Sequence, residues 1–385
     1  MAEIKNFTFE ITSTALCDLK CTYCFEGKKT NTQTLNDKSK LIVQRIKELK
    51  QTQWFKDNFN NLSLSFWGGE PSLNPDFIID IIRQCQHDEM IKFHIYSNGY
   101  NLENLLRIVD SLEDKNKLHI QISHDGKIIH DKFRLNHNNE STGDIVYNNF
   151  KELAKKDIDL SLKSTLTLES LEYINSAWDD FEKLYHESKE ISEKVYVSYA
   201  PTIDYVNCIN QIDRDKELEV FRRQMLKVAK KEINFFIKNN RHLCSWFGGE
   251  KNHKNCSSGY NMVALDVDGS FYVCHGGLYS SFKKHLTMGT LFDDNIAEKI
   301  AEFNESFKSP ISHISDECKD CVATACMICP VNSYEYSKKE NFFDRWLDYG
   351  INNLCSFYRT SGEIDRAIQS YLTKEKYNGV HTNTL

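Results

Sequence analysis

The sequence predicts an α/β fold, an open or closed barrel of parallel strands. Strand-like and helix-like segments alternate over roughly the first two hundred of 385 residues, and polar motifs follow several of the expected strands. This order of elements favours parallel strands joined by right-handed crossovers. In such barrels the working residues lie at the carboxyl ends of the strands.

Each element of the barrel is indicated by the spacing of apolar residues. Strands are expected at Asn6–Thr12, Leu62–Trp67, Lys92–Ser97, Leu118–Ser123, Asp159–Leu168 and Lys194–Ile203. Helices are expected between them, at 38–53, 74–87, 101–113, 142–156 and 169–187. We therefore assign residues 1–205 to the barrel domain.

The C-terminal half differs from the barrel in composition. A charged helical segment, 206–243, is expected to link the barrel to a cysteine-rich domain at 244–357. Short strands are expected there at Met262–Asp266 and Ser270–Val273. Residues 358–385 should form a helix followed by a polar tail. With five prolines in the whole chain, no rigid proline-rich linker is expected between these parts.

Charge and hydropathy exclude several classes of partner. The chain has 48 basic and 55 acidic residues, a formal net charge of −7, with both signs mixed along its length. This balance is poorly suited to following a phosphate backbone, so no nucleic-acid partner is expected. The sequence also has no secretory leader pattern and no run of about 18 apolar residues. We expect a cytoplasmic protein with no membrane partner.

Thirteen cysteines are the leading clue to chemistry. Disulfides are rare in a reducing compartment, so clustered cysteines there indicate metal or redox chemistry. Three cysteines fall at 17–24 and eight at 244–355, whereas Cys85 and Cys208 stand apart. These two are expected to be structural thiols.

Cys17, Cys21 and Cys24 follow the first strand directly. Three thiolates from one short loop can each bind one iron of a 4Fe–4S cluster, which leaves the fourth iron without a protein ligand. A metal that must bind a substrate needs such an open position. The spacing alone would also fit half of a zinc knuckle or a fortuitous cysteine loop.

The segment CDLKCTYC, with Tyr23 before the third cysteine, resembles the signature of the radical S-adenosylmethionine (radical SAM) superfamily. The resemblance implies a partial (β/α)6 TIM-like barrel in which S-adenosylmethionine chelates the open iron. One electron, from a donor such as flavodoxin or ferredoxin, would cleave the cofactor to a 5′-deoxyadenosyl radical that abstracts hydrogen from a substrate. The hard chemistry is then the cofactor's, and the protein orients it.

Two further motifs at strand ends agree with this resemblance. FWGGEP closes the second strand, where Gly68 and Gly69 are expected to let the backbone approach the ligand and Glu70 to receive the cofactor ammonium. YSNG closes the third strand, where Ser97 and Asn98 offer polar groups beside the cofactor.

The end of the fourth strand, Ser123-His124-Asp125-Gly126, is followed by Arg134. It resembles the Ser-Leu-Asp-Gly…Arg pattern of peptide-modifying members, with His124 in place of the usual leucine. The resemblance implies that Ser123 and Arg134 hold the cofactor carboxylate. The alternative for Arg134 is a surface salt bridge. Asp125 is a candidate catalytic residue.

Two sets of four cysteines are available near the C-terminus. They are Cys244, Cys256, Cys274, Cys318, Cys321, Cys326, Cys329 and Cys355. Closely spaced pairs of this kind would normally suggest structural zinc. In a chain that already carries an iron–sulfur motif, we instead expect two auxiliary 4Fe–4S clusters.

The arrangement resembles the SPASM domain of peptide-maturing and anaerobic sulfatase-maturating enzymes. By order, the resemblance assigns one auxiliary cluster to Cys244, Cys256, Cys274 and Cys329, and the other to Cys318, Cys321, Cys326 and Cys355. The last four-cysteine run is spaced more tightly than in the family, so the division between the two clusters stays open.

His275 bears on the reaction. Sulfatase maturases generally have an aspartate base immediately after the cysteine that matches Cys274, and this chain has histidine there. Imidazole can accept a proton near neutral pH, so His275 is a candidate catalytic base. The alternative is a surface histidine or one that only supports its neighbours. The change makes formylglycine formation on a sulfatase the second choice.

The preferred substrate is a ribosomally made precursor peptide that receives an oxidative cross-link, either a thioether or a carbon–carbon bond of cyclophane type. Only about six residues precede the first strand, so no fused leader-binding domain is expected there. The barrel, segment 204–243, the C-terminal tail or a separate leader-binding protein would hold the leader. An iron–sulfur electron carrier without catalysis is the hypothesis from another functional class.

Overall fold

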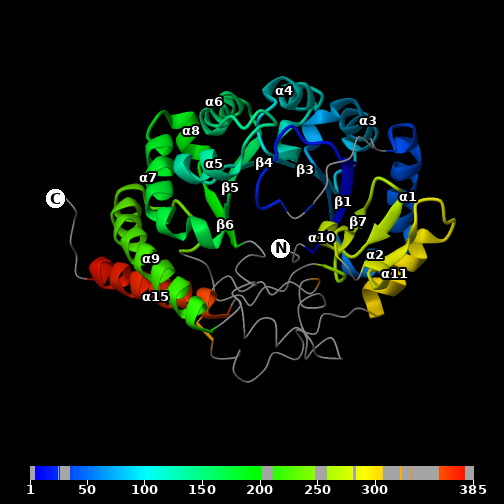
Figure 1. Cartoon of the computed structure of the whole chain (residues 1–385). Helices are drawn as coiled ribbons and strands as arrows, with labels where there is room; N and C mark the ends of the chain where they lie inside the picture. Colours follow the sequence, from blue (N-terminus) through cyan, green and yellow to red (C-terminus); the bar gives the residue numbers. More distant parts are fainter. Residues whose placement is uncertain are drawn as a thin grey trace.

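The computed structural model describes residues 5–24, 26, 35–201, 211–247, 258–280, 283–306, 321–322, 331 and 355–377. A nine-stranded sheet with the order β6-β5-β4-β3-β2-β1-β7-β8-β9 curves into an open arc, and helices cover its outer side (Figure 1). The expected α/β fold, a partial barrel of parallel strands, is therefore confirmed.

Six parallel strands form the barrel part of the sheet. They are β1 (Asn6–Thr14), β2 (Asn61–Gly68), β3 (Ile91–Ser97), β4 (Leu118–Ser123), β5 (Asp159–Leu166) and β6 (Val197–Pro201). Each pairs in parallel with the next strand along the chain. All six had been expected from the alternation of apolar and polar residues.

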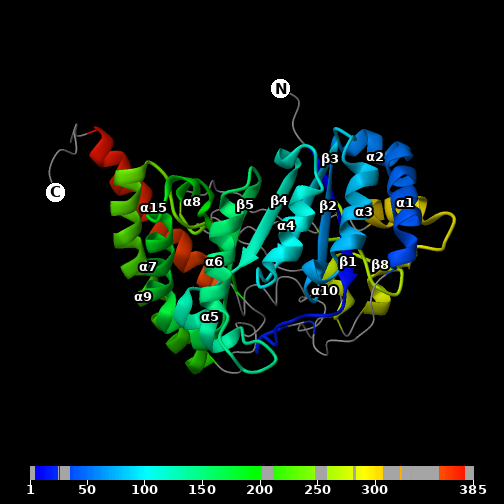
Figure 2. The same cartoon turned by 90° about the horizontal axis from the view of Figure 1, so that it is seen from above.

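The helices between these strands lie outside the sheet, as Figure 2 shows from above. They are α1 (Ser39–Gln51), α2 (Gln53–Asn58), α3 (Pro75–Cys85), α4 (Leu102–Asp110), α5 (Lys127–Phe133), α6 (Gly143–Ala154), α7 (Ile174–Tyr185) and α8 (Lys189–Lys194). Short 3-10 helices cover Asn36–Lys38, Pro71–Leu73, Lys115–Lys117 and Leu168–Tyr173.

Within the barrel domain the sequence misplaced the start of the sixth strand and missed the short helices α2, α5 and α8. The strand expected to start at Lys194 starts at Val197, and Lys194 instead ends α8. The Ser188 side chain caps α8 by accepting a hydrogen bond from the Ile191 N–H. Helix α5 has seven residues, which is too short to show a helical period in the sequence.

The C-terminal half extends the same sheet. Strand β7 (Met262–Leu265) pairs in parallel with β1, and β8 (Ser270–Tyr272) and β9 (Thr287–Thr290) continue it antiparallel. The short strands expected here are confirmed as β7 and β8. Strand β9 had not been predicted, nor had α10 (His275–Leu278) and α11 (Ile296–Ser306). A further 3-10 helix covers Lys283–His285.

Two long helices flank the other end of the arc. Helices α9 (Gln211–Asn239) and α15 (Cys355–Tyr377) lie side by side in Figures 1 and 2, and Phe221 contacts Phe357 between them. None of the helices in the described ranges is both long and apolar enough to cross a membrane.

The two faces of the barrel strands differ in chemistry. In β1, the side chains of Phe7, Phe9 and Ile11 are buried against the helix layer. Because side chains alternate along a strand, the intervening Thr8 and Glu10 lie on the concave face. The concave positions of the six strands are mostly polar. They include Thr8, Glu10, Thr12, Ser63, Ser65, Trp67, His94, Tyr96, His119, Gln121, Ser123, Ser161, Lys163, Thr165 and Ser198.

Candidate active site

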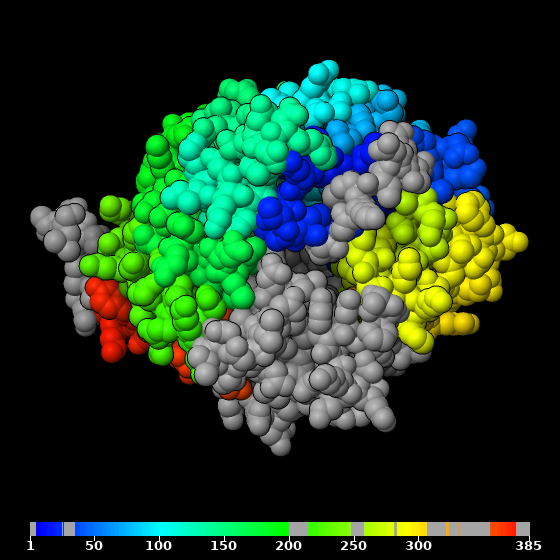
Figure 3. Space-filling model, viewed as in Figure 1, coloured from blue at the N-terminus to red at the C-terminus, as the bar shows by residue number. Residues whose placement is uncertain are grey.

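The cysteine loop that follows β1 is fastened to the segment after α5. The Lys20 N–H donates to the Leu135 carbonyl over 2.8 Å, and the Thr22 N–H donates to the Phe133 carbonyl over 3.0 Å. A ring nitrogen of His137 lies 2.8 Å from the Cys17 carbonyl oxygen. In Figure 3 the dark blue loop lies against this blue-green segment. The loop is therefore anchored on its β4–β5 side.

Cys17, Cys21 and Cys24 are all half-buried in this loop. Within the described residues, no three Cys, His, Asp or Glu side chains converge as they would around a single metal ion. The fit of a cluster rests instead on the donor set: three thiols in one anchored loop at the carboxyl end of a strand. That set suits a cluster with one open iron.

The two glycines at the end of β2 bring it against the backbone that enters the cysteine loop. A Cβ on Gly69 would lie 2.2 Å from the Leu16 carbonyl oxygen, and one on Gly68 would lie 2.2 Å from that of Thr14. The Glu70 N–H donates to the Leu16 carbonyl over 2.7 Å. The close approach that these glycines permit is here to the protein backbone, and their approach to the ligand stays a prediction.

Glu70 is 1% exposed and accepts three hydrogen bonds from the protein. The donors are the Asn98 N–H at 2.6 Å, the Ser97 hydroxyl at 2.8 Å and the Ser72 N–H at 3.0 Å. Burial, followed by the negative charge of Asp18, raises the pKa of Glu70 to about 7. The carboxyl group joins the ends of β2 and β3, and its contact with the cofactor ammonium stays a prediction.

The third strand end reaches the cysteine loop through Asn98. Its amide nitrogen donates to Asp18 over 2.7 Å and lies 3.9 Å from the Cys17 sulfur. The Ser97 hydroxyl accepts from the Gly99 N–H as well as donating to Glu70. The structure therefore brings the cysteine loop and the motifs after β2 and β3 together. Asp18 was not singled out in the sequence.

Asp125 and Arg134 form a buried ion pair at the ends of β4 and β5. The guanidinium donates to Asp125 over 2.7 and 3.3 Å and to the Thr165 hydroxyl over 3.2 Å. Arg134 is only 6% exposed, so a surface salt bridge is excluded. Asp125 also accepts from the Thr165 N–H at 2.7 Å and from the Tyr23 hydroxyl at 2.5 Å.

This network ties Tyr23 of the cysteine loop to two strand ends. Arg134 lies over the Tyr23 ring, 5.2 Å from its centroid. Burial raises the pKa of the Tyr23 hydroxyl well above its usual value, so the phenol stays protonated and donates. Asp125 therefore anchors the loop. A catalytic role for Asp125 and cofactor contacts of Tyr23 and Arg134 stay predictions.

His275 is the first residue of α10, three positions after the end of β8, and it contacts the concave face. Its N–H donates to Glu10 over 2.7 Å, and its Nδ1 lies 3.2 Å from the same carboxylate. The imidazole stacks on Trp67 at 3.8 Å, and Trp67 stacks on Tyr96 at 3.9 Å. Glu10 and this ring stack thus fix the orientation of His275, which is no isolated surface side chain. Its role as a base stays a prediction.

Four of the eight C-terminal cysteines belong to the described residues. Cys244 and Cys274 are buried, and Cys321 and Cys355 are half-buried. The other four lie outside the described residues, and they are Cys256, Cys318, Cys326 and Cys329. The assignment of cysteines to auxiliary clusters stays a prediction.

Cys244 lies close to a buried carboxylate that the sequence had not indicated. Glu232 on α9 accepts from the Leu243 N–H at 2.6 Å and from the Trp178 indole N–H at 2.7 Å. The Cys244 sulfur lies 4.0 Å from the same carboxylate. Glu232 therefore holds the segment around Cys244 against α7 and α9.

Ser123 and Lys163 occupy neighbouring positions in one register row, at the end of β4 and in β5. The row continues to Ser198 on β6, and the Lys163 ammonium donates to the Ser198 hydroxyl over 3.2 Å. Sequence reasoning missed Lys163, as it missed Glu10 and Trp67. The available signal was a charged or aromatic residue among the polar positions of an alternating strand.

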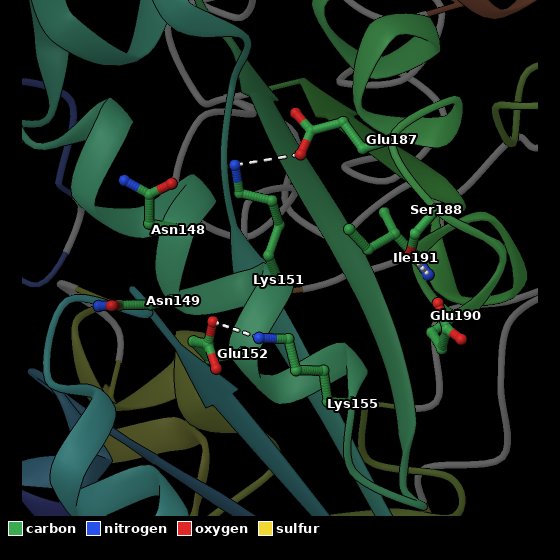
Figure 4. Close-up of a pocket in the computed structure, with 9 residues that line it drawn as sticks. All are labelled: Asn148, Asn149, Lys151, Glu152, Lys155, Glu187, Ser188, Glu190 and Ile191. Carbon is green, nitrogen blue, oxygen red and sulfur yellow. Dashed lines mark hydrogen bonds and ion pairs between the residues drawn. The ribbon is translucent and has the colours of Figure 1, made fainter.

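A pocket of about 520 Å³ lies elsewhere, on the outer side of α6 near α8 (Figure 4). Four of its five charged side chains are already paired, with Lys151 3.1 Å from Glu187 and Lys155 2.6 Å from Glu152. None of the sequence-predicted site residues lines it. The candidate active site is therefore the concave face beside the cysteine loop.

One family model matches the part of the chain that carries the cysteine loop and the motifs after β2, β3 and β4. The model described as "Radical SAM superfamily" matches residues 11–176. A cysteine-type anaerobic sulfatase-maturating enzyme of Clostridium novyi (strain NT) is 22% identical over 330 residues, 79% of this chain and 82% of the relative. A protein of the same description from Clostridium perfringens (strain ATCC 13124) is 24% identical over 334 residues, covering 79% and 83%.

Solved structures share the fold. A histidine-tagged form of anSMEcpe with bound AdoMet matches with a TM-score of 0.66 and 17% identity, covering 90% of this chain and 97% of that one. Streptococcus suis SuiB bound to the precursor peptide SuiA matches with a TM-score of 0.56 and 15% identity, covering 87% and 75%. At these identities the likeness concerns the fold alone.

Proposed function

We infer that this radical SAM enzyme, whose Radical SAM domain spans residues 11–176, abstracts hydrogen from a ribosomally made precursor peptide and closes an oxidative cross-link in it. Two kinds of relative support a peptide substrate. One is named as sulfatase-maturating, and solved structures of similar fold carry the Kp18Cys peptide or the precursor peptide SuiA.

The observation that carries the choice of reaction is the setting of residue 275. A sulfatase maturase is expected to have an aspartate here, whereas this chain has an imidazole held by Glu10 and stacked on Trp67. A stacked and oriented imidazole makes a different set of contacts from a short carboxylate. We therefore favour a reaction other than formylglycine formation.

The residues of this chain have separable tasks in that reaction. Bound S-adenosylmethionine supplies the hydrogen-abstracting radical chemistry. Glu70 and Asn98 hold two strand ends beside the cysteine loop, and Asp125 holds the loop through Tyr23. We assign to His275 the uptake of the proton that leaves the substrate when the new bond forms.

Formylglycine formation on a sulfatase is the second candidate, because the sulfatase-maturating relatives align with 79% of this chain. An assay of the reconstituted, reduced enzyme with S-adenosylmethionine separates the two. The substrate tried is any short candidate precursor peptide encoded beside this gene, and we expect it to lose the mass of two hydrogens. Formylglycine in a sulfatase-derived peptide, with no change in the precursor, would contradict the proposal.

The same assay tests the electron-carrier alternative. A protein that only transfers electrons would consume no S-adenosylmethionine and release no 5′-deoxyadenosine. We expect 5′-deoxyadenosine in amounts that depend on the enzyme and on the reductant. A variant with Cys17, Cys21 and Cys24 all changed to Ala is the matched blank, because it lacks the ligands predicted for the first cluster.

A further inference from the structure

Lys163 is a cation on the concave face of β5. Leu162 and Leu166, on the other face of the same strand, are 0% and 1% exposed against the helix layer. Lys163 and Thr165 alternate with these leucines, so their side chains point to the concave side. Register pairs Lys163 with Ser123 on β4 and with Ser198 on β6, so the ammonium is flanked by two hydroxyl-bearing positions on neighbouring strands.

The side chain of Lys163 is half-buried, and no carboxylate of the described residues pairs with its ammonium. Its hydrogen bond goes to the neutral Ser198 hydroxyl at 3.2 Å. Burial lowers the pKa of Lys163 to about 8, and no charged side chain of the described residues shifts it back. Withdrawing a cation from water without a counter-ion is costly, so proteins usually pair such a group or retain it for a ligand.

The neighbouring cation cannot take over this task without breaking its own pair. Arg134 donates twice to Asp125 and once to Thr165, two positions beyond Lys163 on β5. Asp125 neutralises that guanidinium. The charge of Arg134 is thus compensated. The charge of Lys163 is not compensated by any of the described residues.

We propose that Lys163, together with Ser123, forms a binding subsite for a carboxylate at the carboxyl ends of β4 and β5. An ammonium beside a hydroxyl offers a charge-assisted hydrogen bond and a neutral one to the two oxygens of a carboxylate. Two sources share this chemistry: the methionyl carboxylate of S-adenosylmethionine, and a carboxylate of the substrate peptide. The second source rests on the proposed function, and the first requires only the Radical SAM domain.

Calorimetry on the anaerobic holoenzyme tests the subsite. Binding of S-adenosylmethionine and of the encoded precursor peptide is measured for the wild type, Lys163→Met, Lys163→Arg and the control Lys92→Met, an exposed lysine near the start of β3. Removing the charge should weaken binding of the relevant ligand about ten- to a hundred-fold. Arginine should retain most of the affinity, and Lys92→Met all of it.

Proton uptake gives a second readout that a structural role would not change. A bound carboxylate raises the pKa of Lys163 from about 8 toward the ordinary lysine value, so at pH about 9 binding takes up close to one proton. Comparison of two buffers with different ionisation enthalpies measures this uptake. Ser123 and Ser198 stay uncharged at that pH. Lys163→Met should lose both affinity and uptake, and Lys163→Arg should lose the uptake alone.

The outcomes separate the two sources. If Lys163→Met binds S-adenosylmethionine more weakly, the cofactor carboxylate is the ligand. This conclusion would hold even if no peptide is a substrate. Loss with the peptide alone identifies a substrate carboxylate, and a peptide in which amides replace its carboxylates should then bind wild type and Lys163→Met equally. Unchanged affinity and unchanged proton uptake for both ligands in Lys163→Met would overturn the proposal.

Discussion

Single residues on the concave face connect parts of the chain that are distant in sequence. Glu10 in β1 accepts from the backbone of His275, which lies 265 positions later. Lys163 places a charge in the same row as Ser123. Neither residue belongs to a sequence motif. The role of each is suggested only by the residues that the fold places beside it.

Glu10→Gln tests whether Glu10 positions His275 for the reaction. The amide retains an oxygen for the His275 N–H but removes the negative charge 3.2 Å from the imidazole. We expect cross-link formation to fall roughly ten- to a hundred-fold, as for loss of one charge-assisted contact. Iron content and 5′-deoxyadenosine release should be unchanged.

The control for this variant is Glu152→Gln, which removes a carboxylate that pairs with Lys155 on the outer surface. It should form product at the wild-type rate. Product formation is measured by mass spectrometry under single-turnover conditions. Equal product formation by Glu10→Gln and the wild type would show that Glu10 does not position His275 for the reaction.

Lys163 also predicts a dependence of stability on pH. The unfolded lysine binds a proton up to pH about 10.4, whereas in the folded protein burial lowers its pKa to about 8. Between these values the unfolded state holds more protons, so raising the pH stabilises the folded state through this group. The destabilising effect is full below pH about 8.

In Lys163→Met this contribution is absent. The variant, without added S-adenosylmethionine, should therefore unfold at higher urea concentration than the wild type at pH 7.5, and the difference should shrink at about pH 9.5. A constant difference at both pH values would show that Lys163 carries no buried charge.

At the scale of elements, the close contact between the end of β2 and the segment before Cys17 sets the position of the cysteine loop. Gly69→Ala would place a methyl group against the Leu16 carbonyl, 2.2 Å away in the present structure. Either β2 or the loop must move. We expect a loss of roughly a third of the bound iron, the share of one cluster in three.

Iron analysis together with circular dichroism checks this prediction. Retention of the remaining iron and an unchanged circular dichroism spectrum would show that the rest of the protein is still folded. Full iron content and normal binding of S-adenosylmethionine in Gly69→Ala would show that the contact is not needed to hold the loop.

Local patterns in the sequence were sufficient for most elements and for the motifs at their ends. Alternation such as Phe7, Phe9 and Ile11 marks a strand with one buried face, and FWGGEP and the cysteine loop are contiguous segments. Helix α5 was missed because seven residues show no period. The helix–strand boundary near Lys194 was misplaced because the Ser188 cap was not recognised.

Contacts across the sheet could not be predicted in the same way. The pairing of Thr8 with Met262 joins two strands more than 250 positions apart, and no local pattern specifies it. The contact of Glu10 with His275 depends on that pairing. The polar character of Glu10 and Lys163 was visible, but their partners were not, since these depend on strand order.

At the scale of the whole molecule, one sheet unites the barrel with the start of the cysteine-rich region. Because β7 pairs with β1 and β8 with β7, Cys274 follows a strand of the same sheet that carries the cysteine loop. A cluster held there would lie beside His275 and the concave face. This arrangement suits an electron acceptor next to the substrate.

Eleven cysteines, three in the first loop and eight near the C-terminus, predict about twelve iron atoms in the reconstituted protein. Cys318→Ala with Cys321→Ala should lower the iron content, yet S-adenosylmethionine should still be cleaved. Cross-linked peptide should be absent, because the substrate radical would have no acceptor for its electron. Since cluster binding and folding are coupled, circular dichroism must confirm the fold of this variant. Normal product formation by the folded variant would contradict this acceptor role.

The central claim is that the concave face holds a peptide from which the enzyme removes hydrogen. The most direct measurement uses a precursor peptide deuterated at its side-chain and α-carbon positions, followed by mass spectrometry of the 5′-deoxyadenosine released. We predict that the 5′-deoxyadenosine carries one deuterium and that the same peptide gains a cross-link. Unlabelled 5′-deoxyadenosine, formed at the same rate with and without peptide, would contradict the account.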